Sequence, residues 1–206
     1  MPAINLKLFI SCFVALIALV NPIHKVFVMN SLQAQFDDKS LKFISVKSTI
    51  TALVILILFL LLGQLLFNYF FHVEIYAFQI TCGVVLFYNG ISGLQKGLFI
   101  KMDDNKSIKD IIAVPIAIPM IAGPATITAA VTFPAHYGRV TTILALTASL
   151  FINFIFMIYA KNIGKLLNKL NLMNSLIRIF GLIVATIGVQ MILTGIQEFV
   201  RTMVPS

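Results

Sequence analysis

Residues 113–124 read Ala-Val-Pro-Ile-Ala-Ile-Pro-Met-Ile-Ala-Gly-Pro, which places three prolines and a glycine inside a segment apolar enough to cross a membrane. Each proline lacks a backbone N–H donor and clashes with the carbonyl one turn earlier, at about 3 kcal/mol or more in an ordinary helix. No water in the hydrocarbon core binds the backbone groups that such a break frees. A broken helix is therefore tolerated at that depth only where protein or a polar cavity provides partners.

A second break, Asn21-Pro22, interrupts the first apolar segment. Asparagine is a preferred N-cap residue, and proline suits the first helical position, where its missing N–H has no intrahelical partner. Gly123-Pro124 repeats this pattern, because glycine tolerates the non-helical conformation of a cap. We therefore expect a helix to restart at each break. Paired interruptions in two halves of a chain are the best sequence indication of a transporter's binding site.

The composition is that of an integral membrane protein. Of 206 residues, 60% are apolar and 11% are charged, and the mean hydropathy is +1.02, whereas a soluble domain is about a quarter charged. The length allows six helices of about 20 residues and no soluble domain. Cys12 and Cys82 both lie in apolar segments, so we expect no disulfide framework and no Cys-based metal site. We also expect no other metal site and no cofactor. The lysines lie beside spans, which favours lipid headgroups over nucleic acid as their partner.

Six transmembrane helices are predicted from the runs that lack Asp, Glu, Lys and Arg. These runs are 8–24, 48–73, 75–95, 111–138, 140–160 and 179–197. The loops after the first, third and fifth spans carry ten lysines: Lys39, Lys42, Lys47, Lys96, Lys101, Lys106, Lys109, Lys161, Lys165 and Lys169. The opposite side carries only Lys7, Arg139 and Arg201. The positive-inside rule then places both termini outside the cytoplasm.

The chain also shows an internal repeat. Glycines recur every seven residues in the third and sixth spans, at Gly83, Gly90, Gly97 and at Gly181, Gly188, Gly195. Because half a chain of three spans returns to the membrane with opposite polarity, the halves 1–100 and 101–206 form a predicted inverted repeat. The fold class is thus all-α, a 3+3 inverted repeat with discontinuous first and fourth helices. The glycine-lined faces also suit a homo-oligomer, because small residues let helices pack closely in lipid.

In an inverted repeat the two restarted helices run in opposite directions from the bilayer midplane. Each helix N-terminus carries about half a positive charge and free amides, so together they would hold a carboxylate. Seven residues are candidates for contact with such a solute: Asn21, Pro22, Ala122, Gly123, Pro124, Thr126 and Thr128. Candidates for contact with a cation or an ammonium group are the carbonyls freed by Pro115 and Pro119 and the side chains of Asn89 and Gln190. For Asn89 and Gln190, hydrogen bonding between helices is the alternative role.

All seven acidic residues lie in loops or at span edges: Asp37, Asp38, Glu74, Asp103, Asp104, Asp110 and Glu198. This argues against a carboxylate proton relay and favours a net-neutral zwitterion as solute, with the coupling cation, Na⁺ or H⁺, undetermined. Lys25 lies toward the cytoplasmic end of the first span, and we expect its side chain to snorkel to the headgroups. In the alternative role, Lys25 helps the helix start at the first break to hold a carboxylate.

Other functions find less support in the sequence. No catalytic or nucleotide-binding motif is present, so we expect no enzymatic activity. No ring of charges or repeated filter sequence indicates a channel. A non-transporting membrane scaffold or assembly protein, or an exporter of another small metabolite, remains the alternative to a carrier.

Three segments resemble the MarC family, also classed as UPF0056 and as the neutral amino acid transporter family of the bacterial and archaeal inner membrane. They are Asn21-Pro22, the 113–124 stretch, and Gly181-Leu-Ile-Val-Ala-Thr-Ile-Gly-Val-Gln-Met-Ile-Leu-Thr-Gly-Ile196. The resemblance implies a secondary carrier of small neutral amino acids such as glycine and alanine, located in the inner membrane. The family usually has glycine after Asn/Asp-Pro-x, where this chain has His24-Lys25. It also usually has arginine and two glycines where the third span here begins Gln79-Ile-Thr-Cys-Gly83.

Overall fold

The computed structural model describes residues 5–33, 36–96, 121–170 and 172–203, and these residues form helices without any strand. In chain order the elements are α1 (Leu6–Val20), α2 (Pro22–Leu32), α3 (Asp38–Leu65), the π-helix η1 (Leu66–Phe71), α4 (Ile75–Lys96), α6 (Pro124–Tyr137), α7 (Arg139–Ile158), α8 (Ala160–Lys169) and α9 (Met173–Met203). The predicted all-α class is confirmed.

Five stretches in the described part of the chain are long and apolar enough to cross a membrane. They are Leu6–Asn30, Asp38–Gly63, Ile75–Gln95, Arg139–Ile158 and Arg178–Met203. The first runs through both α1 and α2. The remaining predicted span, 111–138, begins outside the described residues, and α6 covers its second part. The chain is thus a helical multi-pass membrane protein, whose long helices expose leucine, isoleucine, valine and phenylalanine side chains at their outer surfaces.

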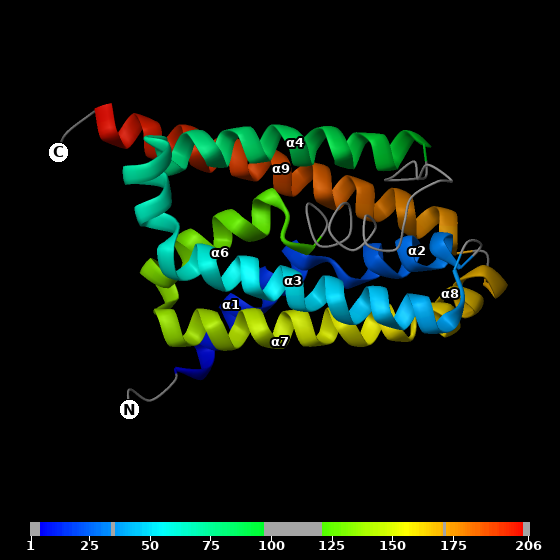
Figure 1. The fold of residues 1–206 in the computed structure, drawn as a ribbon. Helices are drawn as coiled ribbons and strands as arrows, with labels where there is room; N and C mark the ends of the chain where they lie inside the picture. Colours follow the sequence, from blue (N-terminus) through cyan, green and yellow to red (C-terminus); the bar gives the residue numbers. More distant parts are fainter. Residues whose placement is uncertain (1–4, 34–35, 97–120, 171, 204–206) are drawn as a thin grey trace.

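Helices α4 and α9 lie side by side along most of their length and cover one side of the bundle (Figure 1). Their glycines make this close approach possible. A Cβ atom built on Gly83 would lie 2.6 Å from the Gly188 carbonyl oxygen, and one on Gly90 would lie 2.4 Å from the Ala185 nitrogen. The two glycine faces therefore cover each other within one chain. A second copy of the chain finds no free surface at these glycines, contrary to the expected homo-oligomer contact, because backbone already occupies the space.

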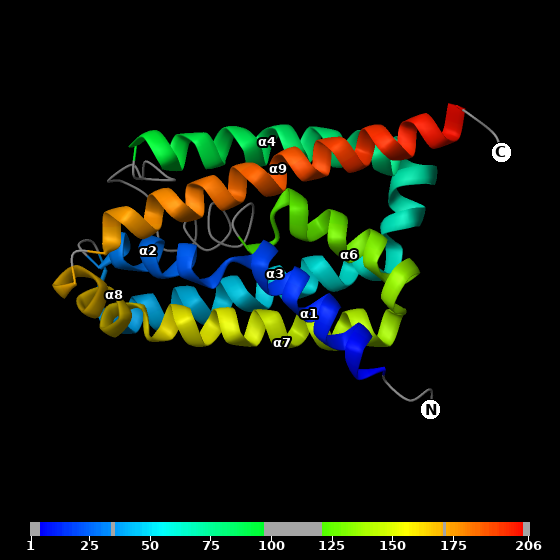
Figure 2. The same ribbon diagram turned by 180° about the vertical axis from the view of Figure 1, so that it is seen from behind.

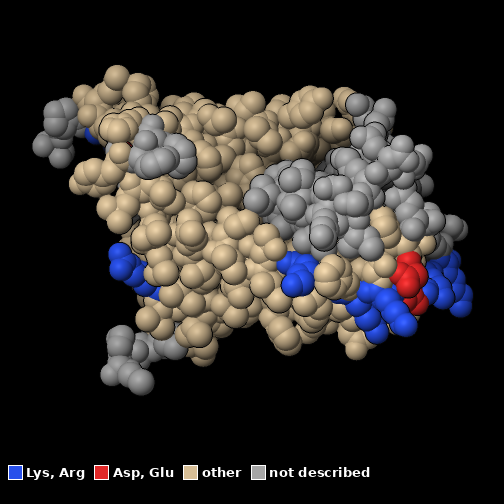
Figure 3. Space-filling view, viewed as in Figure 1, with Lys and Arg blue, Asp and Glu red and all other residues tan. Residues whose placement is uncertain are grey.

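Both ends of the described chain lie at one end of the bundle, where α1 begins and α9 ends (Figures 1 and 2). Exposed lysines gather at the opposite end, around the start of α3 and around α8 (Figure 3). We call this the basic end. There the Lys161 ammonium of α8 pairs with the Asp38 carboxylate of α3 at 2.7 Å, with both side chains exposed. A pair exposed to this degree contributes about 0–1 kcal/mol to stability, so the packing of the helices holds this end together.

Asp37 caps the N-terminus of α3 at the basic end. Its carboxylate accepts a hydrogen bond from the Ser40 backbone N–H at 3.0 Å, and hydrogen bonds from Ser40 hold the pKa of this carboxyl below its ordinary value. A depressed folded-state pKa stabilises the helix start at pH values above the unfolded-state pKa of about 3.9, and this stability is lost as the pH falls through the folded-state pKa.

We therefore expect weaker amide protection at residues 38–41 at pH 3 than at pH 6. Hydrogen exchange measures this, and Asp37→Asn, which keeps the cap without the titration, is the control; equal pH dependence in both proteins contradicts the prediction.

Candidate functional site

The first break is a single residue that ends α1 and caps α2. Asn21 has a left-handed backbone, with φ 49° and ψ 74°, a conformation that asparagine tolerates better than most residues. Its N–H donates to the Ile17 carbonyl at 3.0 Å, and its side-chain Oδ1 accepts from the His24 N–H at 3.2 Å. Asn21 is buried. The predicted restart of a helix at Asn21-Pro22 is therefore present in the structure.

The second break is capped differently. Helix α6 begins at Pro124, and the Ile127 N–H donates to the Gly123 carbonyl at 2.8 Å. Gly123 has φ −80° and ψ 169°, a non-helical cap conformation as expected, but an extended one that does not require glycine. No side chain of the described residues caps this N-terminus. Ala122, Gly123, Ala125 and Thr126 are nevertheless buried, and Pro124 is half-buried, so most of the start of α6 lies inside the protein.

The two breaks lie at a similar level in the bundle. Helix α1 has 15 residues and α6 has 14, which correspond to about 22 Å and 21 Å at the helical rise of about 1.5 Å per residue. Helix α1 begins, and α6 ends, at the end of the bundle where the chain begins (Figure 1). The two helices pack against each other. Two opposite views show α2 and α6 leaving the middle of the bundle in opposite directions (Figures 1 and 2). Helix α1, which ends at the first break, thus packs against α6, which begins at the second.

The α4–α9 pair covers the start of α6. Cys82 of α4 and Met191 of α9 form a small buried cluster with Ala125, and Leu19 of α1 packs against this cluster. Thr126 and Thr128 are buried as well, and the Thr128 hydroxyl donates to the Pro124 carbonyl at 3.0 Å. Cys82 was not predicted at this position. Its place directly before Gly83, on the helix that packs through glycines, was the available signal.

Two predicted polar contacts lie elsewhere. Asn89 of α4 and Gln190 of α9 are exposed on the outer layer, and the Gln190 amide donates to the Thr194 hydroxyl of its own helix at 3.3 Å. The structure does not bring these two side chains to the breaks. The other two candidates, Pro115 and Pro119, lie outside the described residues.

Lys25 is part of the first break, and the expectation that it snorkels to the headgroups was wrong. Its side chain is 2% exposed, and its ammonium Nζ donates to the Val20 carbonyl, the last of α1. In a continuous helix the His24 N–H would bind that carbonyl. Here the His24 N–H binds the Asn21 side chain instead. The break therefore frees one carbonyl, and Lys25 turns inward because that carbonyl attracts its ammonium.

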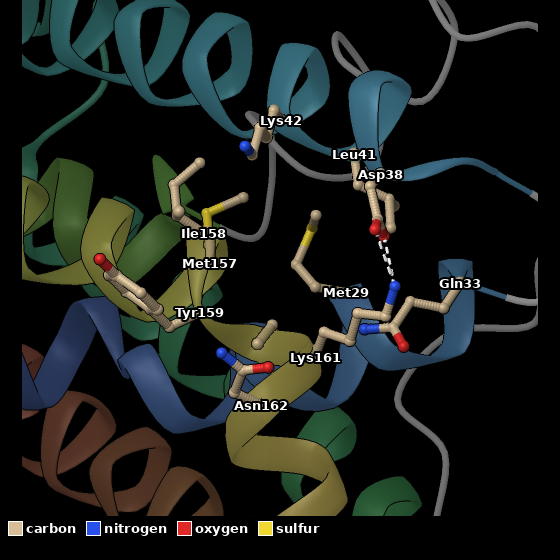
Figure 4. A pocket seen from close by; sticks show the side chains of 11 residues that line it. Met29, Gln33, Asp38, Leu41, Lys42, Met157, Ile158, Tyr159, Lys161 and Asn162 are labelled. Carbon is tan, nitrogen blue, oxygen red and sulfur yellow. Dashed lines mark hydrogen bonds and ion pairs between the residues drawn. The ribbon is translucent and has the colours of Figure 1, made fainter.

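A cavity opens at the basic end among α2, α3, α7 and α8 (Figure 4). Its volume is about 320 Å³, and its lining residues include Met29 of α2 and Met157 of α7. The Lys161–Asp38 ion pair lies along one side of it (Figure 4). Lys25 lies one helical turn before Met29, so the cavity approaches the first break from the basic end.

Comparison with known proteins gives a consistent result over nearly the whole chain. The model of a family described as MarC family integral membrane protein matches residues 6–200. UPF0056 membrane protein PH0214 of Pyrococcus horikoshii is 30% identical over 97% of this chain and 98% of its own length. UPF0056 membrane protein YvbG of Bacillus subtilis is 31% identical over 90% of this chain and 92% of its own. The names of these relatives state a membrane protein and no transported solute. No solved structure matches the chain.

Proposed function

The chain belongs to the MarC family of integral membrane proteins, and from that premise we propose that it is a secondary carrier of small neutral amino acids such as glycine and alanine. The observation that carries the proposal is the pair of buried helix starts, α2 and α6, at one level of the bundle. Each N-terminus carries partial positive charge; Pro22 and Pro124 contribute no N–H, and the Asn21 side chain accepts the His24 N–H at the first break. A solute carboxylate between Asn21-Pro22 and Gly123-Pro124 is the ligand that such a pair favours.

The solute must be small and have no net positive charge. The described acidic residues, Asp37, Asp38, Glu74 and Glu198, are all exposed at helix ends, so none of them offers a counter-charge to a cationic solute near the breaks. Ala122, Ala125 and Gly123 are buried beside the start of α6 and leave little volume for a side chain. A zwitterion with a short side chain satisfies both requirements.

Transport would follow from the two halves of the chain. We propose six spans arranged as two inverted halves, 1–100 and 101–206, with the solute at the midplane between the broken helices. Rocking of one half against the other would expose the solute to the two sides in turn. The lysines at the basic end favour a cytoplasmic position for that end, which places both termini in the periplasm. The gradient that drives uptake, of Na⁺ or of H⁺, would identify the coupling ion.

Uptake of labelled glycine or alanine into proteoliposomes tests this proposal. We expect saturable uptake that responds to a sodium or proton gradient. Gly123→Leu should reduce it by about tenfold or more, because the added side chain fills the space at the α6 start and a misplaced ligand of this kind costs up to about 100-fold in rate. The exposed substitution Leu193→Ala on α9 is the control for folding and reconstitution. If the wild-type protein moves no small amino acid under any gradient, the carrier proposal fails and the membrane scaffold becomes the better explanation.

A further inference from the structure

We propose that Lys25 and Asn153 form a two-point site for the amino acid, in which the Lys25 ammonium binds the carboxylate and the Asn153 Oδ1 accepts a hydrogen bond from the amino group. This inference rests on the proposed transport of small amino acids and adds the residues that distinguish the two ends of the solute. The two side chains lie on α2 and α7. The N-termini of α2 and α6 keep the role proposed above, which is to favour a carboxylate between them.

Lys25 is a charged group without a counter-ion in the described part of the protein. Its side chain is 2% exposed, its ammonium donates to the Val20 carbonyl among the described residues, and its position is inside the candidate span Leu6–Asn30. Charged side chains at such positions are costly and are found where they pair with another group or with a transported solute. The ion pairs of the described residues lie at the helix ends, at Lys161–Asp38 and Arg201–Glu198. A lysine ammonium has three donors, so a carboxylate can join the carbonyl at Lys25 or replace it.

Asn153 is the second group that points to a ligand. Its side chain is fully buried on α7, and its Nδ2 donates to the Met157 sulfur at 3.5 Å. Its Oδ1 has no hydrogen-bond partner among the described residues. A buried acceptor without a partner costs about 1–3 kcal/mol. A solute that brings a donor to this oxygen recovers that free energy.

Lys25 and Asn153 hold matching sequence positions on two helices that pack together. Helices α2 and α7 pack together, and both run toward the basic end (Figure 1). Met29 of α2 and Met157 of α7 line the same cavity (Figure 4). Lys25 precedes Met29 by four residues, and Asn153 precedes Met157 by four residues, so each lies about one helical turn closer to the break. A solute entering from the basic end would therefore meet both groups after passing the two methionines.

Binding at Lys25 also acts on the break itself. Without solute, the ammonium holds the end of α1 to the first turn of α2 through the Val20 carbonyl. A solute carboxylate competes with this carbonyl for the same ammonium. Occupancy of the site thus loosens the link between α1 and α2, which connects solute binding to the hinge between the two helix segments.

Binding of labelled alanine to the purified full-length protein tests the site, with propionate and ethylamine as competitors. Propionate lacks the amino group of alanine, and ethylamine lacks its carboxylate. We expect wild-type protein to bind alanine best, propionate more weakly and ethylamine least. Lys25→Gln keeps a donor for the Val20 carbonyl but removes the charge, and should weaken alanine and propionate alike, by about 30-fold or more. Asn153→Leu should weaken alanine by about tenfold and leave propionate unchanged.

Two variants are the matched controls. Lys25→Arg keeps the charge, and Lys165→Met removes an exposed lysine of α8. Both should retain alanine binding within a few-fold. Thermal melting of each variant separates loss of the site from loss of the fold, because a purely structural Lys25 would lower the melting temperature without changing the order of the ligands. Unchanged alanine affinity in Lys25→Gln, or equal loss of alanine and propionate in Asn153→Leu, would overturn the two-point site. Wild-type protein that binds neither alanine nor glycine would overturn the carrier proposal instead.

Discussion

Replacement of Gly90 by alanine is expected to destabilise the protein by about 1–3 kcal/mol, and replacement by leucine to abolish the folded state. A Cβ atom at this position would lie 2.4 Å from the Ala185 nitrogen and 2.6 Å from the Gly181 carbonyl oxygen. Both are backbone atoms of α9, so no flexible side chain can move aside. The helices must separate by a fraction of an ångström or more, and every contact along the α4–α9 pair weakens as a result.

Thermal melting of the detergent-solubilised protein measures the effect. Tyr88→Ala on the same helix is the matched control, because Tyr88 is 71% exposed and its truncation disturbs no packed neighbour. We expect a clear loss of melting temperature for Gly90→Ala and little change for Tyr88→Ala. Equal stability of Gly90→Ala and the wild type would show that α4 and α9 do not approach through this glycine.

The glycine pattern predicted which helix faces pack closely, but not what covers them. A seven-residue spacing places Gly83 and Gly90 on one face of a helix, and Gly181 and Gly188 on one face of another. Nothing in this spacing says whether the partner is the other helix or a second copy of the chain. That choice depends on the tertiary arrangement, which places α4 against α9 along most of the length of α4.

The same glycines account for the exposure of two polar side chains that were predicted to contact a cation. Successive residues on a helix are rotated by about 100°. Gln190 is two residues after Gly188, so it points about 200° away from the face that packs against α4. Asn89 is one residue from Gly90 and lies at the edge of that face. Both are exposed in the structure, and a rotation counted from the glycines would have predicted this.

The helix starts at Pro22 and Pro124 were predictable because their chemistry is local. Asparagine followed by proline specifies a cap and a helix start within two residues, whatever surrounds them. The position of Lys25 was not predictable in this way. Its inward turn depends on a carbonyl that is free only because the Asn21 side chain takes the His24 N–H. A sequence pattern shows the cap but not the acceptor that the cap leaves behind.

Asn21→Ala should destabilise the protein by about 2 kcal/mol and lower transport more than its stability loss explains. About 1 kcal/mol follows from the lost cap on the His24 N–H. About 1 kcal/mol more follows from the left-handed backbone at φ 49°, which alanine adopts poorly. Asn21→Gly separates the two causes, because glycine keeps the backbone conformation and loses only the cap. We expect its melting temperature to lie between those of Asn21→Ala and the wild type.

The transport effect of Asn21→Ala has a different origin. When the Asn21 side chain no longer binds the His24 N–H, that N–H is free to bind the Val20 carbonyl, as in a continuous helix. The Lys25 ammonium then loses its acceptor, and α1 and α2 join into one straighter helix. Asn21→Ala should therefore reduce uptake at a temperature where the protein is fully folded, whereas Asn21→Gly, with its flexible backbone, should retain part of it. Full uptake in folded Asn21→Ala would show that the break is a structural kink without a role in transport.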